Sequence, residues 1–188
     1  ARNHGVRLHV RSSFTWEVGT WVTEEDSMEQ AIISAVVDDD SEAKVTITGV
    51  PDRPGIAASL FRRLADSDVN VDMIVQNVSE DGVTDISYTA PKDDLATSLA
   101  ITEALAAEIG ATGVTADAGI ARVSVVGAGM KSNPGVAATM FETLANHGIN
   151  IEMISTSAIR ISCVIAADQL EQAVRVLHDA YELAKAPV

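Results

Sequence analysis

The feature that most constrains this chain is an internal duplication. The stretch 45–79, VTITGVPDRPGIAASLFRRLADSDVNVDMIVQNVS, is followed by a second version at 123–158, VSVVGAGMKSNPGVAATMFETLANHGINIEMISTSA. The copies align without a gap from Pro54 on Pro134 to Ile74 on Ile154. The identical pairs in that alignment are Pro54/Pro134, Gly55/Gly135, Ala57/Ala137, Ala58/Ala138, Phe61/Phe141, Leu64/Leu144, Ala65/Ala145, Asn70/Asn150, Met73/Met153 and Ile74/Ile154. A match of this length indicates that one supersecondary unit is present twice.

Each copy predicts the same order of elements. A short β-branched run is typical of a buried strand. A Gly-containing turn follows, in which Asp52 and Ser132 are predicted to cap a helix, with a proline in its first turn. Apolar residues then recur at helical spacing, and third strands are predicted at 84–89 and 159–165, each before a second helix. The unit is therefore β-α-β-β-α, a small antiparallel sheet with helices on one face.

A last strand is still needed to complete each sheet. The run 31–37 lies outside the first repeat and is predicted to complete the second sheet, since that copy runs from its last helix to the end of the chain. The run 113–117 follows a helix expected at about 93–109 and is predicted to complete the first sheet. The fold class is thus α+β, with two βαββαβ units and the first inserted within the second. The predicted bounds are 44–118 for the first unit, 28–43 plus 119–188 for the second, and 1–27 for a stretch outside the repeat.

Composition and charge exclude several kinds of partner. The net charge of −14 argues against nucleic acid and anionic membranes, because both reward basic surfaces. No apolar run approaches the roughly 18 residues that a membrane span needs. The single cysteine, Cys163, falls in a predicted buried strand, where a core role is favoured over a nucleophile, and one unpaired cysteine fits a reducing cytoplasm. The acidic run 38–42 could be read as a cation site, but a solvated loop is favoured.

The sequence matches none of the common catalytic motifs. The stretch 127–132, GAGMKS, departs from a P-loop, which needs glycine before the lysine, and its last residue stands where a dinucleotide fingerprint needs a third glycine. The four histidines show no metal-ligand spacing, and no nucleophile motif such as G-x-S-x-G occurs. We therefore expect a chain that is not an enzyme on its own and that has no catalytic residue, metal or cofactor.

The duplicated turn instead suggests a binding site for a small amino acid. A helix N-terminus offers free backbone N–H groups to a carboxylate, and Gly55 and Gly135 allow a close approach. Asn70 and Asn150 could accept hydrogen bonds from an ammonium group. The alternative is that these residues only build turns. Their retention in both copies, while helix-surface positions such as Arg62/Glu142 differ, favours binding.

The D-R-P-G turn, the helix and N-V-D-M resemble an ACT domain, a regulatory module of amino-acid metabolism. The segments SEAKVTITGVPDRPG, VDMIVQNVS, GAGMKSNPGVAATMFETL and NIEMISTSAIRIS resemble the regulatory region of aspartate kinase, and GVRLHVRSS resembles the end of its kinase domain. The resemblance implies concerted feedback inhibition of the aspartate pathway by threonine and lysine. It also implies a homodimer through the ACT domains, a catalytic aspartate kinase subunit or domain as partner, and a cytoplasmic location.

The resemblance also implies the effector-binding residues, at seams between units of two chains. The threonine-type seam would use Asp52, Pro54, Gly55, Ile56, Ala57 and Gln76, closed by Asn150 and Met153. The other seam would use Ser132, Pro134, Gly135, Val136 and Ala137, with Asn70, Asp72 and Gln76 nearby. Asp72 or Glu152 is the candidate partner of a lysine ε-ammonium. Ala158 departs from the usual S-T-S-E-I-R pattern and removes a carboxylate next to one pocket.

Two other interpretations remain open from the sequence. The chain could be the C-terminal portion of a single-chain aspartate kinase, or a free-standing ACT sensor that acts on another protein. Translation that starts at Met28 would indicate a separate regulatory subunit.

Overall fold

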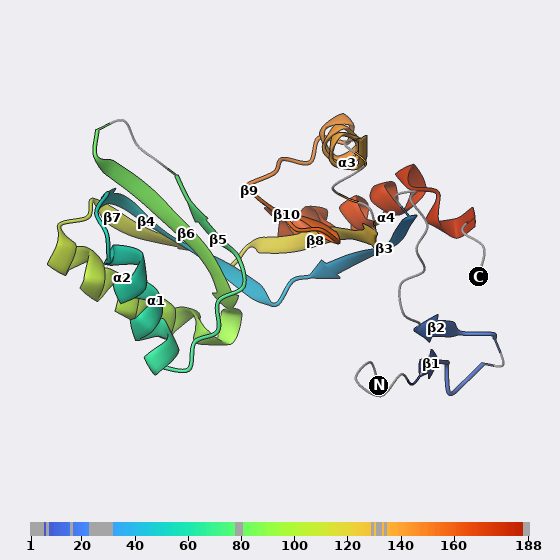
Figure 1. The fold of residues 1–188 in the computed structure, drawn as a ribbon, viewed down its shortest axis with the longest axis horizontal. Coiled ribbons are helices and arrows are strands. Elements are labelled where there is room, and N and C mark those ends of the chain that lie inside the picture. Colours follow the sequence, from blue (N-terminus) through green and yellow to red (C-terminus); the bar gives the residue numbers. More distant parts are fainter. Residues whose placement is uncertain are drawn as a thin grey trace.

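A computed structural model describes residues 6, 8–15, 17–22, 32–77, 81–128, 130, 133 and 135–185. It contains two four-stranded antiparallel sheets, each covered by two helices (Figure 1). A separate two-stranded sheet is formed by β1 (Leu8–Val10) and β2 (Thr20–Val22) near the N-terminus. The alternation of apolar and polar residues over 5–13 is typical of one longer strand. The structure limits it to three residues, and the apolar side chains of Val6, Leu8 and Val10 are about half exposed.

The first unit has the predicted order of elements. Its sheet has the strand order β5-β6-β4-β7, and every neighbouring pair is antiparallel. The elements in chain order are β4 (Glu42–Pro51), α1 (Ile56–Asp66), β5 (Ile74–Gln76), β6 (Val83–Pro91), α2 (Leu95–Ile109) and β7 (Gly113–Asp117).

The second unit is completed by a strand from before the first. Its sheet has the order β3-β8-β10-β9, so β3 occupies the place that β7 has in the first unit. The elements are β3 (Ile32–Asp39), β8 (Ile120–Ala128), α3 (Gly135–Asn146), β9 (Met153–Thr156), β10 (Arg160–Ala166) and α4 (Leu170–Ala180). The predicted α+β class with one unit inserted in the other is therefore confirmed.

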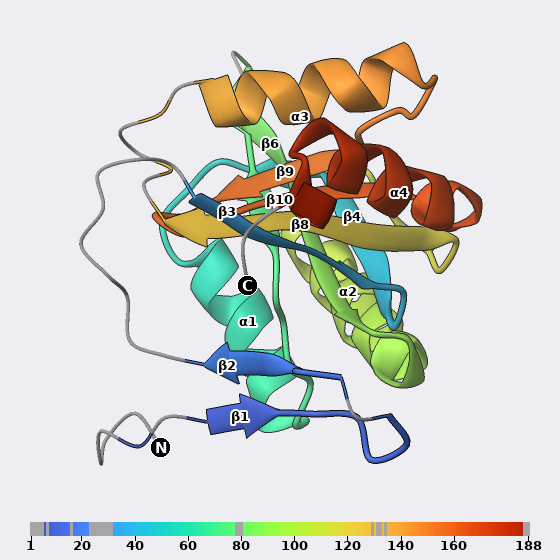
Figure 2. The same ribbon diagram turned by 90° about the vertical axis from the view of Figure 1, so that its right-hand side faces the viewer.

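The alternation of burial along the strands explains why each sheet keeps its helices on one face. In β4, Val45 and Ile47 are fully buried and pack against Leu60 and Leu64 of α1. The second unit repeats the arrangement with its own strands and helices, so each unit has a separate core. Figures 1 and 2 show the two helix pairs on opposite outer sides, with the sheets between them. The helix-free faces are therefore the ones available for contact between the units.

The lone cysteine occupies the core of the second unit, as predicted. Cys163 is fully buried, and burial raises the pKa of its thiol to about 12. None of the described helices is long and apolar enough to cross a membrane.

Cys163 is expected to be unreactive toward a thiol reagent at pH 8 while the chain is folded. An unfolded cysteine has a pKa near 8.5, so its thiolate fraction is roughly a thousandfold larger than that of the buried thiol. Above about pH 8.5 the thiol therefore loses its proton when the chain unfolds. For this reason the free energy of unfolding falls as the pH rises from about 8.5 toward about 12. Ellman's reagent, added with and without denaturant, measures the difference, and rapid labelling of the folded chain would contradict the buried placement.

Candidate functional site

The turn between β4 and α1 leaves an open backbone at the start of the helix. Gly55 has a φ of +100° and precedes α1, and a Cβ built on it would meet nothing within 4 Å. The amide of Asp52 donates to the carbonyl oxygen of Gly82 at 2.9 Å, which ties the turn to the start of β6. The predicted capping role of Asp52 is wrong, because the cap position is Gly55 and no side chain caps the helix. Asp52, Pro54 and Gly55 are exposed and remain available to a ligand.

The residues after the glycine serve mainly to anchor the helix. Ile56 is 7% exposed and belongs to the core of the first unit, so only its backbone can face a ligand. Ala57 is partly buried. In the second unit, Val136 is equally buried, and its carbonyl oxygen accepts a hydrogen bond of 2.7 Å from the hydroxyl of Tyr181. Ala137 also packs against the second core. These side chains position the helix N-terminus.

The second turn is described only in part. Gly135 is the first residue of α3, and a Cβ on it would also meet nothing within 4 Å. Ser132 and Pro134 lie outside the described residues, so their predicted roles stay predictions.

The predicted site residues of the first unit lie at two ends of its sheet. Strands β4 and β5 both pair antiparallel with β6, so they run in the same direction. Gln76, the last residue of β5, therefore lies toward the same end of the sheet as the turn that holds Asp52. Asn70 and Asp72 lie before β5, toward the other end. Asn150 and Glu152 have the same place before β9 in the second unit.

Strands β5 and β9 are free edges that carry exposed apolar residues. Each is the last strand of its sheet. Ile74 and Ile154, which align in the repeat, are 52% and 45% exposed. Unpaired strand edges with apolar side chains are surfaces on which another chain can pair. Gln76 is exposed on the first of these edges.

The carboxylates proposed for an ammonium ligand already contact cations within the chain. Asp72 of the first unit forms an ion pair with Arg122 on β8 of the second. Glu152 of the second unit forms an ion pair with Lys44 on β4 of the first. The structure thus brings both carboxylates to the contact between the units.

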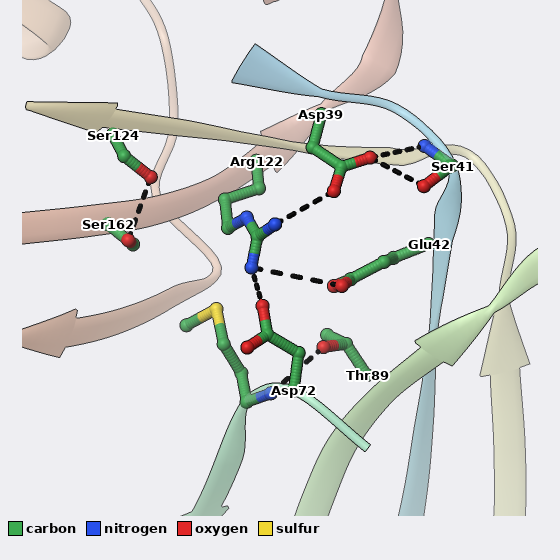
Figure 3. A network of polar contacts seen from close by, with 9 residues as sticks. Asp39, Ser41, Glu42, Asp72, Thr89, Arg122, Ser124 and Ser162 are labelled. Atoms are coloured by element: carbon green, nitrogen blue, oxygen red, sulfur yellow. Dashed lines mark hydrogen bonds and ion pairs between the residues drawn. The ribbon is translucent and has the colours of Figure 1, made fainter. Parts of the chain in front are cut away.

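Arg122 is surrounded by acidic side chains (Figure 3). Its Nη2 lies 2.8 Å from Oδ2 of Asp39, and its Nη1 lies 3.8 Å from Oε1 of Glu42 and also contacts Asp72. Hydrogen bonds from Ser41, together with the charge of Arg122, lower the pKa of Asp39 below its ordinary value. Oε2 of Glu42 is buried without a hydrogen-bond partner in the described structure. Among the described residues no acidic, histidine or cysteine group has the arrangement of a metal site.

An apolar cluster lies beside these ion pairs. Met73 and Met153, which align in the repeat, are 5% and 6% exposed and share this cluster with Ile120 and Val164. Met153 was predicted to close an effector seam, but within this chain its side chain is buried between the units. Lys44 and Arg122 were missed by the sequence analysis, although a cation stands directly before the valine that begins each copy.

Two family models, each described as an ACT domain, match residues 44–110 and 123–181. An aspartokinase of Mycolicibacterium smegmatis is 50% identical over 188 residues, which is 97% of this chain and 45% of that protein. The chain therefore spans less than half the length of this curated relative. Among solved structures, aspartokinase alpha and beta subunits match with a TM-score of 0.76 and 43% identity, over 81% of this chain and 100% of that chain. The ligand-free regulatory subunit of aspartate kinase from Thermus thermophilus matches with a TM-score of 0.75 and 41% identity, over 79% and 97%.

The fold, the paired turns and the two domain matches define a tandem ACT-domain protein, a class of allosteric regulatory module. Its similarity to complete regulatory subunits then specifies the family. The chain belongs to the aspartokinase family and corresponds to the regulatory part of those enzymes.

Proposed function

We propose that this chain binds threonine and lysine at seams between the ACT units of two chains and mediates feedback inhibition of an aspartate kinase. The single observation that carries the proposal is the open turn at Gly55, which presents the N-terminus of α1 at the end of the sheet where the free edge strand β5 ends. Backbone N–H groups at a helix start suit the carboxylate of an amino acid. Gln76, toward the same end of the sheet, supplies an amide that can hydrogen-bond the rest of the ligand.

The same edges support a homodimer. Pairing of β5 or β9 with a strand of a second chain would satisfy their free backbone groups and cover Ile74 and Ile154. A seam at these edges would place groups of both chains around each turn. Effectors that bind the seam in one arrangement more tightly than in another would shift the catalytic partner toward its inactive state, in the cytoplasm.

The catalytic partner is either a separate subunit or the preceding part of one polypeptide. The matched alpha and beta subunit structure favours a separate catalytic subunit. The M. smegmatis aspartokinase, of which this chain matches 45%, favours a role as one region of a longer polypeptide. Both alternatives give this chain the same effector sites and the same regulatory role.

Gln76→Ala is expected to weaken threonine binding by at least about tenfold, because the carboxamide that contacts the ligand is removed. Calorimetric titration of the dimeric chain with threonine and then lysine measures the effect. Glu103→Ala, at an exposed position on α2, is the control and should bind like the wild type. Unchanged affinity in Gln76→Ala would refute this site assignment. Absence of heat from both amino acids in the wild type would refute the effector assignment itself.

A further inference from the structure

The contact between the two units repeats the duplication of the sequence. Lys44 and Arg122 each directly precede the valine that begins their copy, and Asp72 aligns with Glu152. Arg122 of the second unit pairs with Asp72 of the first, and Lys44 of the first pairs with Glu152 of the second. The two ion pairs are therefore reciprocal: each unit supplies one cation and one carboxylate from equivalent positions.

The backbone around the two carboxylates has the same equivalence. The amide of Asp72 donates to the carbonyl oxygen of Thr89 at 3.2 Å, and the amide of Glu152 donates to that of Val164 at 2.9 Å. Each carboxylate therefore projects from a segment that is held against the neighbouring strand of its own sheet. An ion pair from such a segment therefore restrains the position of the whole unit relative to the other unit.

Two short turns connect the units covalently. One joins β3 to β4 and the other joins β7 to β8. In the first, Oδ1 of Asp39 accepts a hydrogen bond of 2.9 Å from the amide of Ser41, and in the second, Oδ1 of Asp117 accepts one of 2.7 Å from the amide of Gly119. Turns of this length can act as hinges, since a few residues absorb the change in backbone angles. The side-chain contacts between the units therefore contribute to their relative orientation, together with the backbone hydrogen bond of 2.8 Å from the amide of Lys92 to the carbonyl oxygen of Ser41.

The two ion pairs differ in their surroundings. Around Arg122 the carboxylates of Asp39, Glu42 and Asp72 outnumber the single guanidinium, which leaves an excess of negative charge. A second cation is attracted to such a cluster. The side chain of Asp72 is 43% exposed, whereas that of Arg122 is 14% exposed. A cation from solvent can therefore reach Asp72, while Arg122 keeps Asp39 and Glu42 as partners after it leaves.

We infer that the two reciprocal ion pairs are a latch that holds the units at one orientation, and that an ammonium group bound at Asp72 opens the Arg122 half of it. This inference rests on the proposed function, lysine binding, and takes Asp72, one of the two candidate partners from the sequence, as the carboxylate that receives the ε-ammonium. Arg122 acts as a positioning residue. Met73 follows Asp72 directly and lies in the apolar cluster between the units, so displacement of Asp72 changes the packing of that contact.

Distances between the units test the latch. Spin labels on Ala100→Cys of α2 and Asp179→Cys of α4, both exposed, report the orientation by pulsed electron resonance, and buried Cys163 stays unlabelled. Asp72→Asn removes one partner of the latch and leaves Arg122 paired with Asp39 and Glu42, so this variant should fold. We expect the Asp72→Asn substitution to shift the distribution of distances between the two labels. Saturating lysine, added to the labelled chain that keeps Asp72, should also shift it. Threonine is expected to leave the Arg122 half closed.

Arg63→Gln is the matched control, because Arg63 pairs with Glu108 inside the first unit. It should leave the distances unchanged. An unchanged distribution in Asp72→Asn overturns the latch, as does calorimetric binding of lysine without a shift. If lysine does not bind at all, the effector assignment and the ammonium trigger both fail, while the Asp72→Asn distances still decide whether the ion pairs hold the orientation.

The affinity for lysine distinguishes competition by Arg122 from a purely structural role, because loss of a purely structural residue would not tighten lysine binding. Arg122→Gln removes the competitor for Asp72, so lysine is expected to bind about tenfold more tightly than to the wild type. Arg63→Gln should bind lysine like the wild type. Weaker or equal binding by a folded Arg122→Gln chain overturns the competition between Arg122 and the ligand.

Discussion

Leu64→Ala and Leu144→Ala are each expected to lower the free energy of unfolding by about 2–5 kcal/mol. The two leucines align in the repeat, lie on α1 and α3, and are fully buried against their sheets. Truncation removes the transfer free energy of the lost carbons and leaves a cavity, because a sheet packed on its other face by the neighbouring unit cannot collapse freely.

Urea denaturation followed by circular dichroism measures both variants, with Glu142→Ala as an exposed control on α3. The control should change the free energy of unfolding by less than about 0.5 kcal/mol. If the two units unfold together, Leu64→Ala and Leu144→Ala shift one common transition. If the contact between the units is weak, each variant moves a separate transition that belongs to its own unit. A loss below about 1 kcal/mol in both would contradict the two-core arrangement.

The fold could be predicted because both copies of the repeat indicate the same strands, turns and helices. Each copy contains the same β-branched run, turn and helix pattern, and this agreement leaves few alternative folds. The strand at 113–117 was predicted with the bounds that the structure shows. The place of β3 in the second sheet followed from the need to complete two sheets, and the structure confirms it, because β3 pairs with β8 of that sheet. These conclusions depend on local patterns and on the short list of ways to pack helices on a sheet.

The detailed geometry of the turn was less predictable. Asp52 has the side chain of a helix cap, but the chain reaches α1 through Gly55 with a positive φ, so the cap position falls three residues later. Local composition identified the right segment and the wrong residue. Glycine adopts positive and negative φ about equally well, so the sequence alone does not say which φ Gly55 has. The positive φ is set by the direction in which the turn must lead the chain into α1.

The ion pairs between the units could not be inferred from local patterns. Lys44 and Glu152 are separated by 108 positions, and their contact depends on how two finished units pack together. The repeat did carry a signal, since both copies place a cation before the first valine and a carboxylate before the shared methionine. Charges kept at equivalent positions, while the helix surfaces differ, indicate a shared contact.

Gly49→Ala is expected to lower the free energy of unfolding by about 2–4 kcal/mol, from two causes. Gly49 has a φ of +65° at the irregularity in the β4–β6 pairing, a conformation that costs a side chain about 1–2 kcal/mol. A Cβ there would also lie 2.0 Å from Oγ1 and 3.2 Å from the backbone amide of Thr112. Because that amide donates to the carbonyl oxygen of Thr48 at 2.8 Å, the turn before β7 would have to move with it.

Gly110→Ala separates the two causes. Gly110 has a φ of +73° at the end of α2, and a Cβ built on it meets nothing within 4 Å, so this variant carries the conformational cost alone, about 1 kcal/mol. The difference between the variants in urea unfolding therefore measures the collision with Thr112, and equal losses would show that the turn yields without cost. Because β4 continues from Gly49 into the turn of Asp52, Gly49→Ala should also weaken threonine binding, whereas Gly110→Ala should leave it unchanged.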